Sequence, residues 1–203
     1  MANPIHIGFL IYPNVTQLDA TGAAEILSRV PDAVIHMVWK NTAPVATDAG
    51  FSINPTDSFA TCPQLDILCV PGGKGQRPLM ADSEVLGFLQ QQGTAARYVT
   101  SVCSGSLLLG AAGLLKGYRA ASHWAFRDLL PMFGAEPVAE RVVRDRNRIT
   151  GGGVTAGIDF GLTMAAEIAG EDVAKQIQLL VEYNPDPPFD AGTPEDRKST
   201  RLN

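Results

Sequence analysis

The chain has 203 residues, of which 45% are hydrophobic, and it carries a formal net charge of -5 with a pI of about 5.1. This length and composition are enough for one well-buried domain of ordinary size. The acidic balance excludes the broad positive field that holds nucleic acid or an anionic membrane, so neither is expected as a partner.

Three cysteines, Cys62, Cys69 and Cys103, have no spacing typical of a zinc site or a disulfide framework. A reducing cytoplasm is therefore the expected location. The N-terminus has neither the positive region nor the cleavage site of a signal peptide. Residues 98–115 form an uncharged run long enough to cross a membrane, but their Thr, Ser and Gly content favours a strand, a turn and a helix instead.

Strands and helices alternate in the first part of the predicted fold. Ile5–Tyr12 is a nearly continuous apolar run, as expected of a strand covered on both faces. A crossover helix is predicted over Gln17–Val30, and the second strand over Ala33–Lys40. Two short extended pieces within Thr42–Thr56 predict a small hairpin appended to the main sheet.

The same alternation continues through the middle of the chain. Leu65–Val70 is a third buried strand, and it ends in the turn PGGKG, residues 71–75. A helix is predicted over Ser83–Gln92, a strand over Arg97–Val102, and a Gly- and Leu-rich helix over Ser104–Leu115.

The last third predicts helices over His123–Met132, Ala156–Gly170 and Glu171–Tyr183, with strands near Pro137–Arg144 and Arg148–Thr150. The basic stretch RVVRDRNR within this part is interrupted by an acid, which is typical of the solvated face of a hairpin. It is given no functional weight.

This order of elements predicts an α/β fold with a mostly parallel sheet in a single domain, residues 1–184. Residues 185–203 are predicted to be a proline-rich arm, lying across the surface or disordered, and its final RKSTRLN fits no pattern in the rest of the chain. In such sheets ligands bind outside the carboxyl ends of the strands. Three features fall at such ends: the loop holding Asp19, the PGG turn, and Cys103.

Cys103 lies where the strand TSV meets the helix SGSLLLG. A sharp turn there would lift the sulfur out of the sheet. Amides at the start of the helix would stabilise a thiolate and lower its pKa from about 8.5 into the range of roughly 3.5 to 7.5. The alternative is an inert buried thiol, the commoner fate of a free cysteine, and this is the interpretation of Cys62 and Cys69.

A cysteine nucleophile usually needs a partner. Among the three histidines only His123 lies outside the interior of a predicted strand, and it either takes part in the chemistry or forms part of a pocket wall. Asp19 is the better candidate, although the helix dipole alone also favours an acid in a first turn. Beside the sulfur in a dry pocket Asp19 would have a raised pKa and could act as a general acid. Glu25 is a weaker candidate for the same role.

The PGGKG turn is not a Walker loop, because the Lys-Ser/Thr ending is missing. With Cys103 nearby, the amides of Gly73 and Ser104 are predicted to hold developing negative charge. Gly72, Gly73 and His123 are therefore the candidate substrate-binding or oxyanion residues. The later run TGGGVTAGID is interpreted as close backbone packing at the start of a helix.

Several segments together resemble the ThiJ/PfpI superfamily, the cysteine branch of the class I glutamine-amidotransferase-like fold. They are GFLIYPNVTQLDATG, DILCVPGG, YVTSVCSGSLLLGAAGLL, ASHWAF, ERVVRDRNRITGGGVTAGIDF and EYNPDPPFDAG. The resemblance covers about residues 5–194. Within the superfamily the chain is most similar to members that hydrate isonitriles.

The resemblance implies a flavodoxin-like sheet sandwiched by helices, a homodimer, Cys103 as nucleophile, an acid at Asp19, and a hydroxyl neighbour at Ser104, where relatives often have Thr. It implies conversion of an isonitrile and water to an N-substituted formamide through a thioimidate on Cys103, with no metal or organic cofactor. Two alternatives remain open. One is a glyoxalase or deglycase acting on small reactive carbonyls, in which His123 would matter more. The other is a non-catalytic ligand-sensing domain related to amidotransferase-like transcription regulators.

Overall fold

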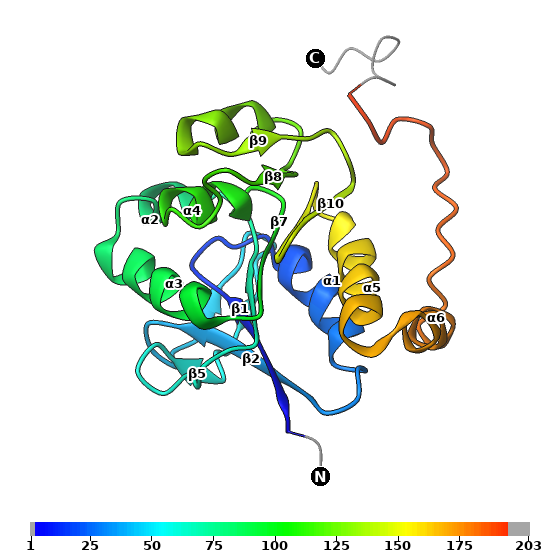
Figure 1. The fold of residues 1–203 in the computed structure, drawn as a ribbon, viewed down its shortest axis with the longest axis horizontal. Helices are drawn as coiled ribbons and strands as arrows, with labels where there is room; N and C mark the ends of the chain where they lie inside the picture. Colours follow the sequence, from blue (N-terminus) through cyan, green and yellow to red (C-terminus); the bar gives the residue numbers. More distant parts are fainter. Residues whose placement is uncertain (1–2, 195–203) are drawn as a thin grey trace.

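A seven-stranded sheet runs through the middle of the structure, a computed structural model that describes residues 3–194 (Figure 1). Its strands are β1 (Ile5–Leu10), β2 (Ala33–Trp39), β5 (Asp57–Ser58), β6 (Ile67–Val70), β7 (Tyr98–Val102), β10 (Val142–Asp145) and β11 (Arg148–Gly151). Their order across the sheet is β10-β11-β7-β6-β1-β2-β5, and only β10 runs antiparallel to its neighbour. The predicted α/β fold with a mostly parallel sheet is confirmed.

Helices cover both faces of this sheet (Figure 1). One face carries α1 (Gln17–Leu27), α5 (Ala156–Ala169) and α6 (Glu171–Leu180), and the other carries α2 (Gln76–Leu79), α3 (Ser83–Ala95) and α4 (Gly105–Ala111). Every residue of β6 and β7 is buried, because helices pack on both sides of these central strands. Neither strand contains a charged side chain, which meets this requirement.

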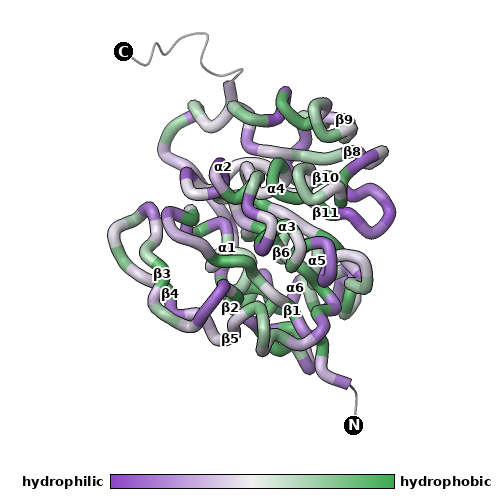
Figure 2. Tube along the Cα trace, turned by 90° about the vertical axis from the view of Figure 1, so that its left-hand side faces the viewer, coloured by the Kyte–Doolittle hydropathy of each residue, from purple (hydrophilic) through white to green (hydrophobic). Residues whose placement is uncertain are grey.

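The predicted hairpin exists but belongs to a separate sheet. β3 (Val45–Ala46) and β4 (Ser52–Ile53) pair only with each other, and Figure 2 shows this hairpin at the side of the molecule. It is joined to the main body by a bridge between Val15 and Thr47, just before α1, and by a hydrogen bond of 2.6 Å from the hydroxyl of Thr16 to Asp48. The edge strand β5 was not among the predicted elements.

The single strand predicted over Pro137–Arg144 is wrong. The chain here forms β9 (Glu136–Pro137), which pairs with β8 (Arg119–Ala120), and then β10, which pairs with β11. The segment between them passes from the small sheet to the large one, so the chain cannot stay in one ladder. Only the tertiary arrangement of the two sheets imposes this break.

Several helix ends also differ from prediction. The segment expected to be an α-helix over His123–Met132 is instead a 3₁₀-helix, η1 (Arg127–Phe133), which contains Pro131. Proline has no N–H to donate within a helix, and this favours a short, irregular element. Helix α4 ends at Ala111 rather than Leu115, and α1 and α6 each end three residues before the predicted end.

After α6 the described chain contains no helix or strand as far as Pro194, and it runs along the side of the molecule (Figure 1). The final RKSTRLN of the predicted arm lies outside the described residues. Within residues 3–194 no helix is long and apolar enough to span a membrane. The uncharged run 98–115 divides into β7, a turn and α4 instead.

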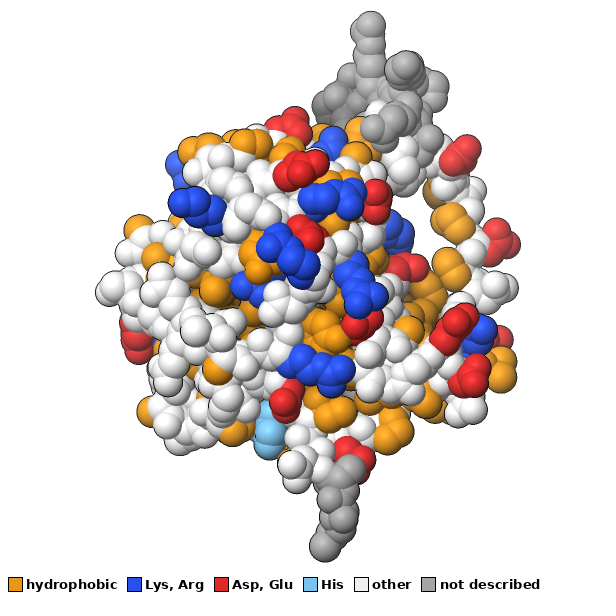
Figure 3. Space-filling model, in the orientation of Figure 1, with side chains coloured by type: hydrophobic (Ala, Val, Ile, Leu, Met, Phe, Trp, Pro, Cys, Tyr) orange, Lys and Arg blue, Asp and Glu red, His pale blue; other side chains and the backbone are white. Residues whose placement is uncertain are grey.

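The basic stretch of residues 141–148 lies on a surface where charges of both signs alternate (Figure 3). Its Arg141, Arg144 and Arg146 form ion pairs of 2.7, 2.7 and 3.0 Å with Asp159, Glu167 and Asp145, respectively. Their charge is therefore largely matched by neighbouring carboxylates, as expected of a solvated hairpin face.

Candidate active site

Cys103 occupies a strained turn between β7 and α4. Its φ of +60° lies in the left-handed region, which non-glycine residues rarely adopt and which costs on the order of 1–3 kcal/mol. The backbone holds it there: its N–H donates to the carbonyls of Gly151 and Gly152, at 3.1 and 2.7 Å. Its carbonyl accepts hydrogen bonds from the hydroxyls of Ser106 and Ser122, at 3.3 and 3.1 Å. These four hydrogen bonds thus stabilise a backbone conformation that is unfavourable for a cysteine by itself.

Gly105, the first residue of α4, makes this turn possible. An ideal Cβ at Gly105 would overlap the carbonyl oxygen of Val70, so the helix start lies directly against the end of β6. Since a backbone atom cannot move aside as a flexible side chain does, this position excludes every larger residue.

We expect Gly105→Ala to destabilise the protein by about 1–3 kcal/mol, because the helix start must move away from β6. The matched control is Gly87→Ala in α3, where nothing lies within 4 Å of an added Cβ. That change should stabilise the helix by about 0.5–1 kcal/mol. Thermal unfolding of both variants measures the difference, and equal melting temperatures would contradict the close packing described here.

Asp19 lies in the first turn of α1 and is completely buried. Its Oδ2 accepts a hydrogen bond of 2.8 Å from the amide of Gly72. Its Oδ1 has no hydrogen-bond partner among the described residues. Burial raises the pKa of Asp19 from its usual 3.8 to about 7, and the Gly72 amide and the Cys103 thiol act in the opposite direction. A buried carboxyl with one free oxygen is therefore poised to exchange a proton near neutral pH.

The glycines of the PGG turn hold the polar side chains of the site. The amide of Gly73 donates to the hydroxyl of Ser104 at 3.2 Å, just as Gly72 donates to Asp19. A Cβ at Gly72 would lie 2.6 Å from both the amide nitrogen and the Oγ of Ser104. The turn can therefore approach the start of α4 this closely only with glycine there. The amide of Gly73, predicted to face a substrate, is directed at Ser104.

The predicted lowering of the Cys103 pKa is wrong for this structure. Burial, followed by the charge of Asp19, raises the pKa of Cys103 to about 12, and the amide of Ser104 opposes this rise only in part. The thiol is 6% exposed, so the loss of hydration outweighs the amides of the helix start. Between the two pKa values Cys103 and Asp19 together hold one proton.

Two residues of the site were not predicted from the sequence. Tyr12, the last residue of the predicted first strand, is fully buried and donates from its hydroxyl to the carbonyl of Pro71 at 2.8 Å. The hydroxyl of Ser122 donates to the carbonyl of Cys103. Neither role has a local sequence signal, because each partner lies 19 or more positions away.

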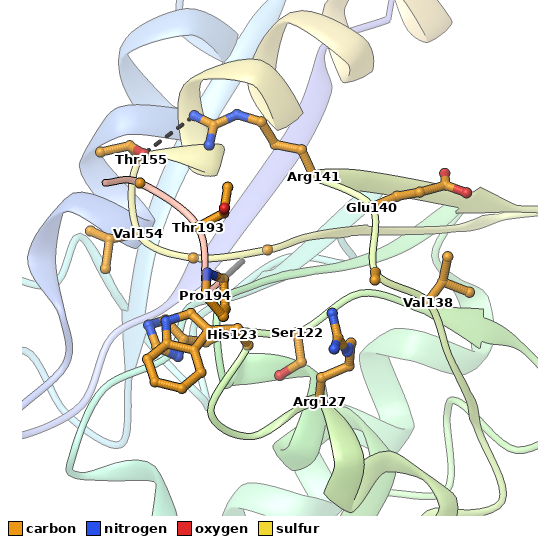
Figure 4. A pocket seen from close by; sticks show the side chains of 15 residues that line it. Ser122, His123, Arg127, Val138, Glu140, Arg141, Val154, Thr155, Thr193 and Pro194 are labelled. Atoms are coloured by element: carbon orange, nitrogen blue, oxygen red, sulfur yellow. Dashed lines mark hydrogen bonds between the residues drawn. The ribbon is translucent and has the colours of Figure 1, made fainter. Parts of the chain in front are cut away.

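His123 does not contact the sulfur through any hydrogen bond among the described residues. Its Nδ1 accepts from the amide of Ala125 at 3.2 Å, and burial lowers its pKa. It lines a cavity of about 460 Å³ together with Trp124, Arg127 and Gly153 (Figure 4). Cys103 and Asp19 are not part of the lining, but the cavity lies beside the backbone of Cys103, because Ser122 and Gly152, which hydrogen-bond to that backbone, both line it.

The weaker acid candidate lies elsewhere. The side chain of Glu25 is 61% exposed and forms an ion pair of 2.6 Å with Arg29. No cluster of three or more His, Cys, Asp or Glu side chains that could hold a metal ion is found within residues 3–194. The groups available for chemistry are therefore the thiol, the buried carboxyl and the hydroxyl of Ser104.

Comparison with known proteins agrees with this geometry. The model of the DJ-1/PfpI family matches residues 6–167. The chain belongs to the DJ-1/PfpI family.

Individual relatives are similar over most of the chain. An isonitrile hydratase of Pseudomonas putida is 56% identical over 94% of this chain and 84% of its own. The crystal structure of a ThiJ/PfpI family protein from Pseudomonas syringae superimposes with a TM-score of 0.92 at 52% identity, covering 95% of this chain and 80% of that one. The HTH-type transcriptional regulator GbdR of Pseudomonas aeruginosa is 31% identical over 89% of this chain, which spans 51% of the regulator.

Proposed function

We propose that this protein hydrates isonitriles to N-substituted formamides, with Cys103 as nucleophile and Asp19 as the acid and base. The observation that carries the proposal is the pairing of a thiol in a strained turn with a buried carboxyl whose pKa is about 7. The 56% identity to an isonitrile hydratase supports the same reaction. No metal or organic cofactor is required in this scheme.

The first step uses the single proton shared by the pair. An isonitrile carbon accepts a nucleophile when a proton is supplied to that same carbon. The sulfur of Cys103 forms the S–C bond, Asp19 delivers the proton to form the C–H bond, and the carbon–nitrogen triple bond becomes a double bond. The product is a neutral thioimidate on Cys103, and Asp19 is left as a carboxylate. Covalent attachment divides one difficult addition into two easier steps.

The second step consumes one water molecule. The carboxylate of Asp19 accepts a proton from the water while the oxygen adds to the thioimidate carbon, and the nitrogen takes up a proton. The proton that Asp19 took from the water is the one passed to the nitrogen. As the C–S bond breaks, the hydroxyl on the carbon gives its proton to the Cys103–Asp19 pair and becomes the carbonyl of the formamide, so the pair again holds one proton. Ser104, held by the amide of Gly73, and the amide of Gly72 orient the reacting groups, and His123 contributes to the wall of the neighbouring cavity.

The direct test is to mix the purified protein with a simple alkyl or aryl isonitrile and follow formamide formation. Methylglyoxal is the parallel substrate. Turnover of methylglyoxal without formamide formation would favour the glyoxalase or deglycase alternative. No turnover of either compound, with Cys103 unmodified by any electrophile, would favour a ligand-sensing domain, the role suggested by the similarity to GbdR.

The rate of hydration should depend on pH in a defined direction. Below about pH 7 Asp19 is protonated while the thiol keeps its proton, so the sulfur has no proton acceptor. We therefore expect kcat/KM to fall about tenfold per pH unit below pH 7 and to be flat between about pH 8 and 10. A rate that increases toward acid pH would contradict the assignment of Asp19 as the group that takes the thiol proton.

We also propose that the protein is cytoplasmic and forms a homodimer. The three cysteines are unpaired, in keeping with a reducing compartment. A groove of about 560 Å³ runs between α1, α5 and the end of α6; Leu180, which lines it, and the adjacent Leu179 are 71% and 82% exposed. Exposed apolar side chains beside an apolar groove are typical of a surface that binds another protein. A monomeric mass in sedimentation experiments at micromolar concentration would contradict the dimer.

A further inference from the structure

Tyr12 connects the end of the first strand to the turn that holds the site. Its side chain is completely buried, and its hydroxyl donates a hydrogen bond of 2.8 Å to the carbonyl of Pro71. The next two residues, Gly72 and Gly73, donate their amides to Asp19 and Ser104. The phenol is therefore bonded to the carbonyl of the same peptide unit whose N–H donates to Asp19, and the amide of Gly73 belongs to the next unit.

We propose that Tyr12 is a positioning residue for this site, because its phenol fixes the PGG turn so that the turn's amides orient Asp19 and Ser104 beside Cys103. The ring itself has little freedom. It lies 6.3 Å from the ring of Trp39, and a Cβ at Gly75 would lie 3.1 Å from its Cδ2. Because the ring is held in the core, its hydroxyl holds the carbonyl of Pro71, and with it the turn, in one position.

The phenol acts as a donor and does not supply the reaction's proton. Burial raises the pKa of Tyr12 well above its usual value, and the charges of Asp19 and Cys103 raise it further. Tyr12 therefore keeps its proton throughout the pH range of the proposed reaction. Tyr12 fixes the position of Pro71, so it can affect catalysis only by positioning the PGG turn.

The consequence should be visible at Asp19. The amide of Gly72 is the strongest influence that lowers the Asp19 pKa, and it opposes burial. The other groups near the carboxyl are the Cys103 thiol, which also lowers its pKa, and Asp48 of the hairpin, which raises it. Removing the Tyr12 hydroxyl leaves the Pro71 carbonyl buried without this donor, and the turn is free to move away from Asp19. The carboxyl then keeps its proton to a higher pH.

The test is Tyr12→Phe, which deletes one hydroxyl and keeps the ring. Tyr98→Phe is the matched control: that hydroxyl donates to Glu167 at 2.7 Å, and Tyr98 lies at the opposite end of β7 from Cys103. The kinetic part rests on the proposed function. For an isonitrile substrate we expect Tyr12→Phe to lower kcat about tenfold with little change in KM, and to move the midpoint of the pH profile upward by about half to one unit. Tyr98→Phe should change neither, although both variants lose some thermal stability.

A second measurement does not depend on hydration. The rate of Cys103 alkylation by iodoacetamide is followed against pH by mass spectrometry of the Cys103 peptide, so that Cys62 and Cys69 do not contribute. Because the buried thiol keeps its own proton at these pH values, alkylation, like hydration, needs the Asp19 carboxylate to accept that proton, and the low-pH midpoint of the profile reports the Asp19 pKa. Tyr12→Phe should therefore move this midpoint upward relative to the unsubstituted protein and to Tyr98→Phe. A shift without any isonitrile turnover would count against the proposed function and support the role of Tyr12. If Tyr12→Phe only lowers the melting temperature, with kcat and both midpoints unchanged, Tyr12 is merely structural and the inference is wrong.

Discussion

Replacing Cys103 with alanine is expected to reduce isonitrile hydration by about 10⁴-fold or more. Without the sulfur no covalent thioimidate forms, and the shared proton has no nucleophile to accompany it. Losses of this size are typical when the nucleophile of a covalent mechanism is removed. Formamide formation measured at several enzyme concentrations determines the residual rate.

The matched control is Cys62→Ala. Cys62 is half-buried, and its Sγ donates only to the neighbouring carbonyl of Pro63. Burial raises its pKa to about 11, and the carbonyl that it donates to cannot take its proton as the Asp19 carboxylate does for Cys103. The control should keep full activity. Hydration that survives Cys103→Ala would remove the proposed mechanism even if the protein proved to be a hydratase.

Replacing Asp19 with asparagine is expected to lower kcat by about 10²- to 10⁴-fold, because the thiol loses its proton acceptor and the isonitrile carbon its proton donor. The amide oxygen of asparagine can still accept the hydrogen bond from Gly72, so the turn should remain in place. The residual rate should no longer show an inflection near pH 7.

The same substitution should stabilise the protein at alkaline pH. The pKa of Asp19 is about 7 in the folded protein and near 3.8 when unfolded, so the folded state binds more protons between these values. Stability of the unsubstituted protein therefore decreases as the pH rises from about 4 to 7. At 1.36 kcal/mol per pH unit the full cost is roughly 4 kcal/mol, and it is complete above pH 7. Asparagine carries no charge and avoids this cost.

Denaturant unfolding at pH 5 and pH 8 measures the effect. Asp128→Asn is the control, because that carboxyl is 90% exposed and the same chemical change there should alter neither stability nor rate. If Asp19→Asn is less stable than the unsubstituted protein at pH 8, the buried carboxyl is not costly, and its raised pKa would have to be reconsidered.

The chain's apolar runs were sufficient to predict the parallel sheet. Residues 67–70 and 98–102 contain no charged side chain, and such runs suit a strand covered on both faces. The short strands β5 and β9 were harder to predict, because each is two residues long and contains polar side chains or proline. Such short elements depend on which neighbour is available for pairing, and this information is not local.

Some residues of the site could likewise be predicted from the sequence, and others could not. Cys103 and Asp19 could be found from their positions at the carboxyl ends of predicted strands, since a parallel sheet brings those ends together. Tyr12 could not, because its function depends on a hydrogen bond to Pro71, 59 positions away. The 3₁₀ geometry of η1 likewise follows from the path of the chain around Pro131, where the sequence pattern alone favoured an α-helix.

The sign of the Cys103 pKa shift separates the two kinds of information most clearly. Local sequence shows that a cysteine precedes a helix, and helix amides favour a thiolate. The folded arrangement adds burial and a carboxylate, and both favour the neutral thiol. Residue order thus predicts the strands, the turn and the reactive pair, because these depend on local pattern and on the geometry of parallel sheets. The pKa values of Cys103 and Asp19 depend on desolvation and on charges brought together from distant segments, so only the folded structure determines which group holds the proton.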